Sequence, residues 1–225
     1  MNDEIQLVIG NRNYSSWSLR AWLALQKSGV SFETVVLPLD TPEFEERIGD
    51  YSPTRRVPVL WHEGRCIWDS LAIGEYVNEQ FAGGSLWPHD AASRGMGRAM
   101  AAEMHSGFPY LRNKMPMNCR ARNRQVPVDR ALGADIERIW TLWSDALSAH
   151  ADAGPWLLGG YSLADAMFAP VVLRFRTYGV APPRDIELYC RAVLGDPDLQ
   201  PWLEAAREES WVIDAEEVGE EGGAA

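Results

Sequence analysis

The chain has 225 residues, 46% of them apolar and 24% charged, so it is long enough to bury one large core or two small ones. Its formal net charge of −11 argues against a nucleic-acid partner, because no basic stripe is available to contact phosphates. The first residues are acidic where a signal peptide is basic, and no apolar run approaches the ~20 residues of a membrane span, so we expect a cytoplasmic protein without a membrane partner.

A strand followed by an amphipathic helix opens the chain. Ile5, Leu7, Val8 and Ile9 predict a short buried strand, and apolar side chains recur at helical spacing from Trp17 onward, up to Gly29 as the C-cap. Between them stands the run Asn-Tyr-Ser-Ser-Trp-Ser-Leu-Arg at residues 13–20, which places hydroxyl groups at a helix N-terminus. Unpaired backbone N–H groups and the helix dipole favour an anion there, such as a thiolate, carboxylate or phosphate. Plain capping by Ser15 or Ser16 explains one hydroxyl equally well.

The following segments predict a small mixed sheet with helices. The expected elements are a strand over 32–37, at most a short helix within 41–50, strands over 55–61 and 66–68, and a helix from 70 to 82. The second strand completes a βαβ unit with a parallel pair, and the last two strands form a hairpin. Pro58 stands at a strand entrance, where a cis peptide is tolerated. Asp69 or Ser70 is the expected N-cap of the last helix.

Beyond residue 90 the strand signal disappears and helical spacing continues. Helices are expected over about 91–114, 128–151, 162–175, 186–194 and 199–209. Ser162 and Asp165 predict a capping box, and the helix that follows is apolar nearly all round, as in the buried centre of a bundle. We therefore expect a first domain over 1–82, a linker over 83–90, an all-helical domain over 91–213 and an acidic flexible tail over 214–225.

Cysteines and histidines give no sign of a metal centre. The three cysteines are far apart, and the four histidines do not cluster. We expect free thiols and no metal site.

Four short motifs follow one another in a fixed order. They are Ser15-Ser16-x-Ser18-x-Arg20, Val57-Pro58, Asp69-Ser70, and Ser162-x-x-Asp165 preceded by two glycines. Together they resemble the cytosolic glutathione S-transferases over nearly the whole chain, and within that family the serine-type, zeta-like (maleylacetoacetate isomerase-like) members. The resemblance implies an α/β thioredoxin-like N-terminal domain followed by an all-α helical bundle. It also implies a homodimer.

The resemblance implies glutathione as co-substrate, bound in a groove of the N-terminal domain. A free thiol titrates near pH 8.5, and a hydroxyl hydrogen-bonded to the thiolate at a helix N-terminus lowers that pKa. We expect Ser15 to supply this hydroxyl, with Ser16 and Tyr14 as the next candidates. Ser18 is expected to be structural, and Arg20 either keeps this end electropositive or forms a plain salt bridge.

The other ends of the tripeptide have their own candidates. By resemblance, the backbone of Val57, beside a cis Pro58, pairs with the cysteinyl part as an added strand does. Asp69 and Ser70 would hold the γ-glutamyl end, although simple N-capping is the alternative for that pair. Arg55 and Arg56, from their positions in the sequence, are candidates for the glycyl carboxylate.

The leading prediction is an enzyme that conjugates glutathione to a small electrophile. The alternative is the zeta-like isomerase, which the serine motif favours but Trp17 opposes, because the zeta pattern has a cysteine at that position. Thiol–disulfide exchange is disfavoured, because the first-helix motif contains no cysteine. A non-catalytic binding module is the third reading. The electrophile is expected between the two halves, against the first long helix. Candidates there are Met104, His105, Phe108, Tyr110 and Arg112, with Arg112, Arg120, Arg122 and Arg124 for an anionic acceptor or, for the last three, a solvated loop.

Overall fold

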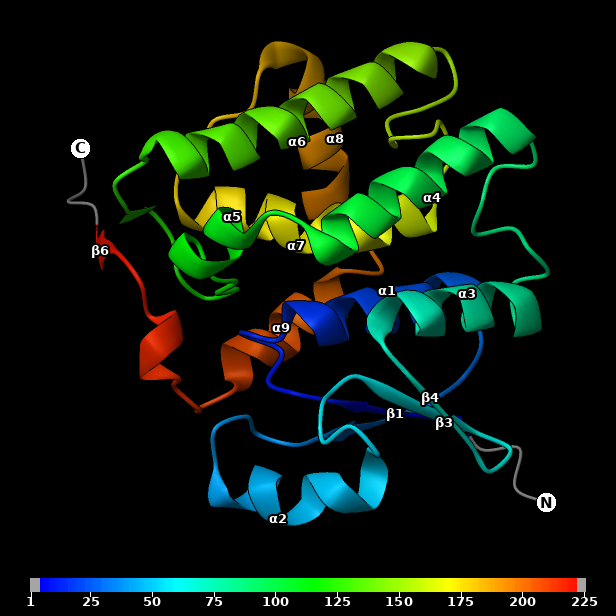
Figure 1. Cartoon of the computed structure of the whole chain (residues 1–225), viewed down its shortest axis with the longest axis vertical. Coiled ribbons are helices and arrows are strands. Elements are labelled where there is room, and N and C mark those ends of the chain that lie inside the picture. Colours follow the sequence, from blue (N-terminus) through cyan, green and yellow to red (C-terminus); the bar gives the residue numbers. More distant parts are fainter. Residues whose placement is uncertain (1–4, 222–225) are drawn as a thin grey trace.

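The computed structural model describes residues 5–221 and shows a small mixed sheet with helices on both faces, followed by a helical half. Its first half contains β1 (Gln6–Ile9), α1 (Ser16–Ser28), β2 (Glu33–Val36), α2 (Pro42–Tyr51), β3 (Val59–His62), β4 (Arg65–Trp68) and α3 (Ser70–Gln80). Figure 1 shows α1 and α3 on one face of the sheet and α2 on the other. The N-terminal half therefore has three layers.

The sheet has the order β2-β1-β3-β4. β1 and β2 are parallel, with Val8 opposite Val35, whereas β3 is antiparallel to β1 and β4 is antiparallel to β3. The predicted parallel pair, the predicted hairpin and the thioredoxin-like arrangement are thus confirmed. The cis peptide predicted between Val57 and Pro58 is also present, immediately before β3.

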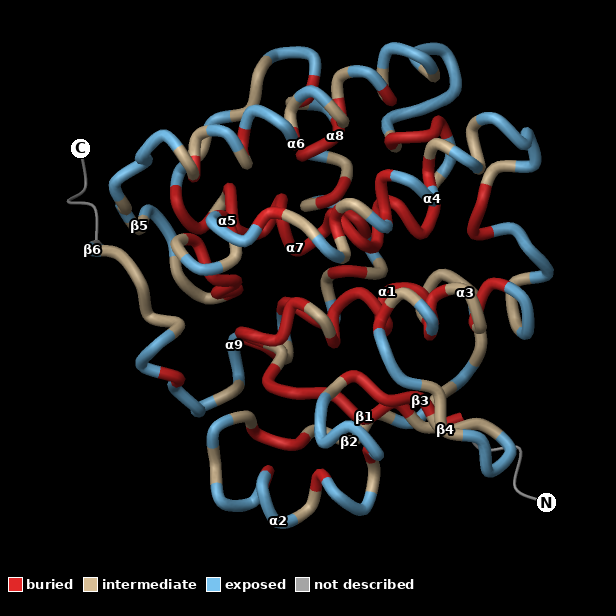
Figure 2. The backbone as a smooth tube through the Cα atoms, viewed as in Figure 1, coloured by how far each residue is buried: buried red, intermediate tan, exposed pale blue. Residues whose placement is uncertain are grey.

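The second half is helical. Its elements are α4 (Ala91–Ser106), α5 (Pro109–Lys114), β5 (Arg124–Gln125), α6 (Arg130–Ala149), α7 (Leu163–Thr177), α8 (Arg184–Leu194) and α9 (Gln200–Glu208). Figure 2 shows that α7 is buried along its length, whereas the outer sides of α4 and α6 are exposed. The predicted bundle with an apolar central helix is therefore confirmed. The chain carries a thioredoxin-like half followed by a helical half, and the domain boundaries placed between them stay a prediction.

The single long helix expected over 91–114 is wrong. The chain ends α4 at Ser106 and begins α5 at Pro109, and Phe108 between them has a left-handed backbone with a φ of 61°. A proline disfavours the helical conformation of the residue before it, so Phe108 cannot continue the helix. The guanidinium of Arg112 then donates to the carbonyls of Gly107 (2.9 Å) and Met104, which caps the broken end.

The predicted capping box at the start of α7 is present. The carboxylate of Asp165 accepts from the backbone N–H of Ser162 (2.8 Å) and from its hydroxyl (3.0 Å). It also accepts from the N–H of Leu157, in the preceding loop, at 3.1 Å. Because Asp165 is buried, these bonds hold both the loop and the helix start in place.

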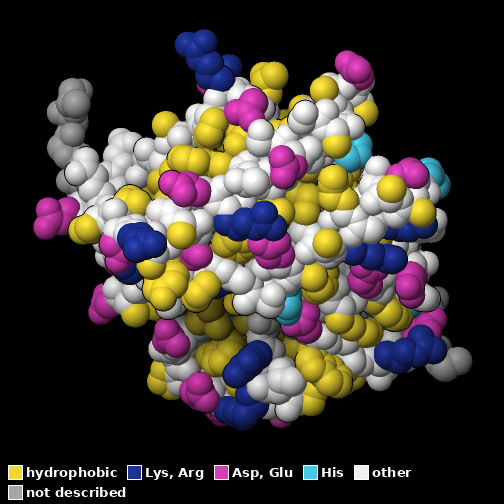
Figure 3. Space-filling model, turned by 45° about the horizontal axis from the view of Figure 1, so that its top comes forward, with side chains coloured by type: hydrophobic (Ala, Val, Ile, Leu, Met, Phe, Trp, Pro, Cys, Tyr) yellow, Lys and Arg dark blue, Asp and Glu magenta, His cyan; other side chains and the backbone are white. Residues whose placement is uncertain are grey.

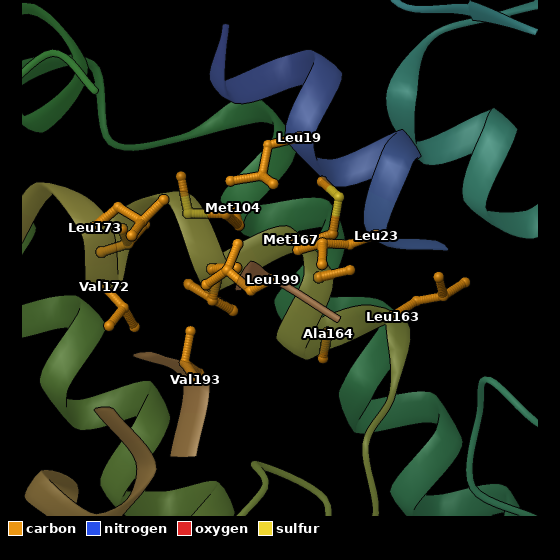
Figure 4. Close-up of a cluster of buried hydrophobic side chains, with 14 of the residues drawn as sticks. Leu19, Leu23, Met104, Leu163, Ala164, Met167, Val172, Leu173, Val193 and Leu199 are labelled. Atoms are coloured by element: carbon orange, nitrogen blue, oxygen red, sulfur yellow. The ribbon is translucent and has the colours of Figure 1, made fainter. Parts of the chain in front are cut away.

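Acidic and basic side chains are interspersed on the face shown in Figure 3, as expected for a chain without a basic stripe. Underneath, one continuous apolar core joins the two halves of the chain. Figure 4 shows part of it, where Leu19 and Leu23 of α1 meet Met104 of α4 and Met167 of α7. No helix within residues 5–221 has the length and hydropathy that a membrane crossing requires.

Gly97 in α4 packs so closely in this core that adding one methyl group there should lower the stability of the protein. A Cβ added at Gly97 in α4 would lie 2.5 Å from a Leu158 methyl carbon and 2.9 Å from the Trp87 ring. Gly97→Ala is therefore expected to lower the free energy of unfolding by about 1–3 kcal/mol in a urea titration. The matched control is Gly95→Ala on the same helix, which meets nothing within 4 Å and is expected to gain about 1 kcal/mol from helix propensity. Equal stabilities of the two variants would contradict this packing argument.

The segment after α9 runs back to the loop that precedes α1. We name residues 209–221 the C-terminal strap. The carboxylate of Glu209 accepts from the N–H groups of Arg12 (2.8 Å) and Asn13 (3.0 Å). The carboxylate of Glu217 accepts from the hydroxyl of Tyr14 at 2.6 Å.

The strap corrects the expectation of a flexible tail from residue 214. Arg124 forms an ion pair with Glu217 at 2.9 Å, and β5 pairs with β6 (Glu220–Glu221). Acidic side chains that looked solvated in the sequence thus meet donors from the first strand–helix loop and from the basic loop after α5. Residues 222–225 lie outside the described residues.

Candidate functional site

A cleft of about 480 Å³ lies where the two halves of the chain meet. It is lined by Trp17, Thr54, Arg56, Val57, Pro58, Trp68, Asp69, Ser70 and His105. Figure 3 shows a hollow on this face, between the helical part and the sheet part. Five of the residues predicted to bind glutathione, from Arg56 to Ser70, therefore line one cleft.

The backbone before β3 forms one wall. The hydroxyl of Ser52 donates to the carbonyl of Arg56 (2.8 Å) and accepts from its N–H (3.2 Å), which fixes the loop that leads into Val57. Neither the N–H nor the C=O of Val57 hydrogen-bonds to another residue within 5–221. This wall therefore presents a free backbone donor and acceptor, as an unpaired strand edge does.

The turn between β4 and α3 forms the opposite wall. Asp69 is the N-cap of α3, and its carboxylate accepts from the N–H groups of Leu71 (2.9 Å) and Ala72 (3.4 Å). Its second oxygen lies 3.1 Å from Nε2 of His105, on α4. Asp69 has a φ of 77°, a left-handed conformation that is strained for a residue other than glycine and that often marks functional sites. The capping alternative is thus realised for Asp69, with one carboxylate oxygen still directed to the other half of the chain.

Ser70 differs from Asp69 in having no internal partner. Its hydroxyl is buried and finds no hydrogen bond in the described part of the chain. A buried hydroxyl without a partner costs about 1–3 kcal/mol. Because Ser70 also lines the cleft, a molecule bound there would supply the missing partner. Ser70 also contributes to the first turn of α3, where backbone N–H groups favour an anion.

Ser15 lies beside the cleft but does not line it. It is the N-cap of α1, and its hydroxyl donates to Oγ of Ser18 at 2.7 Å. The Oγ of Ser18 also accepts from the N–H of Gly10, at the end of β1. Trp17, two residues after Ser15, does line the cleft. In the ligand-free chain the Ser15 proton therefore points inward, toward Ser18.

The two other predicted hydroxyls are engaged elsewhere. Ser16 accepts from the guanidinium of Arg174 at 3.2 Å. The Tyr14 hydroxyl donates to Glu217 and accepts from Arg120 at 2.9 Å. Burial and Glu217 together raise the pKa of Tyr14. The structure therefore places neither hydroxyl among the cleft-lining groups.

Three arginines come together near Trp17, a grouping that sequence reasoning missed. The guanidinium carbons of Arg20 and Arg112 lie 4.4 and 4.5 Å from the Trp17 ring centroid. Arg20 is buried, and only its Nε has a partner, the carbonyl of Met167. Burial lowers the pKa of Arg20, and burial and Arg112 together lower that of Arg174 to about 10. Because these groups stay charged at pH 7, they make the potential around Trp17 positive.

Two roles are expected for Arg20 from the sequence, an electropositive helix end or a salt bridge. The salt bridge is not formed, because no carboxylate among residues 5–221 pairs with Arg20. Of the residues expected at the electrophile site, only His105 lines the cleft. Met104 and Phe108 are buried in the core, Tyr110 is 48% exposed, and Arg112 bonds to backbone carbonyls. Helical spacing alone does not reveal the break at Phe108, which separates α5 from α4.

Comparison with known proteins gives a consistent result. Residues 14–80 match the family model of the glutathione S-transferase N-terminal domain. Glutathione S-transferase L1 of Arabidopsis thaliana is 26% identical over 82% of this chain and 71% of its own length. Maleylacetoacetate isomerase of Rattus norvegicus is 28% identical over 75% of this chain and 77% of its own length.

Solved structures share the fold over most of the chain. A glutathione transferase homolog from Burkholderia with bound glutathione has a TM-score of 0.71 at 24% identity, over 92% of this chain and all of the other. A bacterial zeta-class maleyl pyruvate isomerase has a TM-score of 0.70 at 24% identity over the same shares. At this identity the likeness concerns the fold.

Proposed function

We propose that this chain, whose residues 14–80 match the glutathione S-transferase N-terminal domain, binds glutathione in the cleft and activates its thiol for transfer to a small electrophile. The observation that carries the proposal is a set of unused hydrogen-bonding groups on one cleft. They are the buried hydroxyl of Ser70 and the backbone N–H and C=O of Val57. The cleft volume, about 480 Å³, is in the range of small-molecule sites.

The tripeptide would lie along the two walls. The Val57 backbone pairs with the cysteinyl unit as a strand edge does, beside the cis Pro58. The Ser70 hydroxyl and the first N–H groups of α3 receive the γ-glutamyl carboxylate, while the second Asp69 oxygen receives its ammonium group. Arg56, exposed at the rim, is the candidate for the glycyl carboxylate.

The thiol would then lie at the N-terminus of α1. There the helix dipole and the charges of Arg20 and Arg112 favour the thiolate over the thiol. Ser15 supplies a hydrogen bond to the sulfur when its O–H turns from Ser18 toward the cleft. The thiolate attacks the electrophile, which enters from the side of Trp17 and His105.

The test is the ultraviolet thiolate absorbance of bound glutathione as a function of pH. We expect the bound thiol to titrate at least about one unit below the ordinary value near 8.5. Binding without a shifted pKa would favour the non-catalytic binding module. No binding would overturn the proposal. The homodimer implied by the resemblance and the cytoplasmic location expected from the sequence stay predictions. Sedimentation analysis tests the homodimer.

Ser70→Ala is expected to weaken glutathione binding about tenfold or more. The variant removes a buried donor to a carboxylate, a hydrogen bond that typically contributes about 1.5–3 kcal/mol. Isothermal calorimetry measures the change. Ser85→Ala, at an exposed serine of the linker, is the matched control and should bind like the wild type. If both variants bind equally well, Ser70 does not contact the ligand.

One observation favours a second candidate, a glutathione-dependent isomerase. Arg20 and Arg112 have no carboxylate partner among the described residues, so an anionic acceptor near Trp17 would find positive charge. Relatives and structural neighbours include maleylacetoacetate isomerase and maleyl pyruvate isomerase, whose names denote carboxylate substrates. Assaying isomerisation of a maleyl keto acid beside conjugation of chlorodinitrobenzene separates the two activities.

A further inference from the structure

Ser15 and Ser18 share one short hydrogen bond inside the protein. The two Oγ atoms are 2.7 Å apart, and Ser15 donates. The N–H of Gly10 donates to the same Ser18 oxygen at 3.1 Å, and the N–H of Ser18 approaches Oγ of Ser15 at 3.4 Å. Ser18 is fully buried and Ser15 is 6% exposed. The pair is therefore shielded from water and anchored to the end of β1.

Counting protons in this pair leaves one unused. Each hydroxyl has one hydrogen to donate and two lone pairs to accept with. The Ser18 oxygen accepts twice, from Ser15 and from Gly10, while its own hydrogen finds no acceptor in the described part of the chain. Only one hydrogen fits between the two oxygens. The hydroxyl hydrogen of Ser18 is therefore available as a second hydrogen-bond donor.

We propose that Ser18 is a positioning residue. It lets the Ser15 hydroxyl donate a hydrogen bond to the glutathione sulfur while the hydrogen bond between Ser15 and Ser18 is kept. When the Ser15 O–H turns toward the thiolate, the hydrogen of Ser18 moves into the bridge and the Ser15 oxygen becomes its acceptor. No covalent bond forms or breaks in this change. This inference rests on the proposed function, because it requires a thiolate beside Ser15.

The reversed bridge has an electrostatic consequence. In the chain from Gly10 N–H through Ser18 and Ser15 to the sulfur, every group donates to the next, and each bond polarises the one that follows. The Gly10 end packs closely against Leu39. A Cβ at Gly10 would lie only 2.8 Å from the Leu39 side chain, and the neighbouring Asn11 side chain accepts from the N–H of Leu39. Ser18 thus connects the sheet to the proposed nucleophile through Ser15.

The competing explanation is purely structural. Ser18 could serve only to tie α1 to the end of β1 through Gly10. In that case Ser18→Ala lowers the free energy of unfolding but leaves the pKa of bound glutathione where the wild type has it. The two explanations therefore differ in the thiolate titration, which stability alone does not move.

The experiment is the absorbance titration of bound glutathione with Ser18→Ala and Ser18→Thr in the full-length protein. We expect Ser18→Ala to raise the pKa of the bound thiol by about 0.5–1 unit, the effect of one hydrogen bond. At pH 6.5, kcat/KM falls about three- to tenfold while KM for glutathione stays nearly unchanged. Ser18→Thr keeps the hydroxyl and should restore the wild-type pKa. Ser28→Ala, which removes a local bond to Leu25 at the other end of α1, is the control.

A double-mutant cycle tests whether Ser18 acts through Ser15. In a Ser15→Ala background, Ser18→Ala should cause no further rise in the pKa. A wild-type pKa in Ser18→Ala, or equal effects with and without Ser15, would overturn the proposal. If Ser18→Thr does not fold, Ser18→Cys offers a weaker donor and should give an intermediate pKa. An unshifted pKa in the wild type would refute the proposed function itself, and the role of Ser18 with it.

Discussion

Replacing Ser15 with alanine is expected to lower kcat/KM for glutathione conjugation about a hundredfold. The reason is that in the proposed function the hydroxyl stabilises a charge on the attacking sulfur, and removal of one such preorganised donor typically costs about that factor. Affinity for glutathione should change little, because the residues proposed to hold the tripeptide are Val57, Asp69 and Ser70. Steady-state kinetics and calorimetry on the same preparation measure both quantities.

Because Ser15 is also a helix N-cap, its loss should cost about 1 kcal/mol of stability. Thr41→Ala is the matched control, since Thr41 caps α2 through the N–H of Phe44 and is not among the residues that line the cleft. It should lose similar stability and keep its activity. If the two variants lose equal and small fractions of turnover, Ser15 is a cap and nothing more.

Asp165→Ala is expected to lower the free energy of unfolding by about 3–5 kcal/mol. The substitution leaves three buried donors, two of them on Ser162 and one on Leu157, without their acceptor. Urea denaturation measures the loss. Asp129→Ala removes an exposed N-cap of α6 and is the control, expected to cost about 1 kcal/mol. A loss of similar size in both variants would contradict this account.

The same carboxylate gives stability a pH dependence of known sign. Burial outweighs its hydrogen bonds and raises the pKa of Asp165 to about 6, against about 3.9 in an unfolded chain. Between about pH 4 and 6 the folded state binds more protons at Asp165 than the unfolded chain does. The contribution of Asp165 to the free energy of unfolding is therefore full below about pH 4 and is lost as the pH rises through about 6. In Asp165→Asn that part of the pH dependence should disappear from the unfolding free energy.

Features encoded by neighbouring residues could be predicted from the sequence. Val57-Pro58 and Asp69-Ser70 each lie within one turn at a strand end, so their spacing alone brings them to one edge of a small sheet. The capping box of Asp165 is equally local. For the same reason the order of strands and helices could be predicted, since it depends on hydrophobic periodicity and turn residues.

Features that depend on contacts between distant segments could not be predicted. Arg174 donates to Ser16, which lies 158 positions earlier in the chain. Nothing in the composition of α7 indicates that the Arg174 guanidinium contacts the start of α1. The inward orientation of the Ser15 hydroxyl depends on Gly10, eight residues before Ser18. Pro109 is a local signal for the break at Phe108, but the helical spacing of the apolar residues on both sides favours one continuous helix.

The C-terminal strap has a consequence for the order in which the protein is made. The loop before α1 is tied by Glu209 and Glu217, about 200 positions later in the chain. A ribosome releases the N-terminal half first, and that half starts to fold before the strap exists. The thioredoxin-like half therefore emerges with residues 12–14 unfastened, and the loop is completed only once residue 217 has been synthesised. A nascent chain stalled before that point would carry the cleft walls of β3 and α3 without a finished entrance to α1.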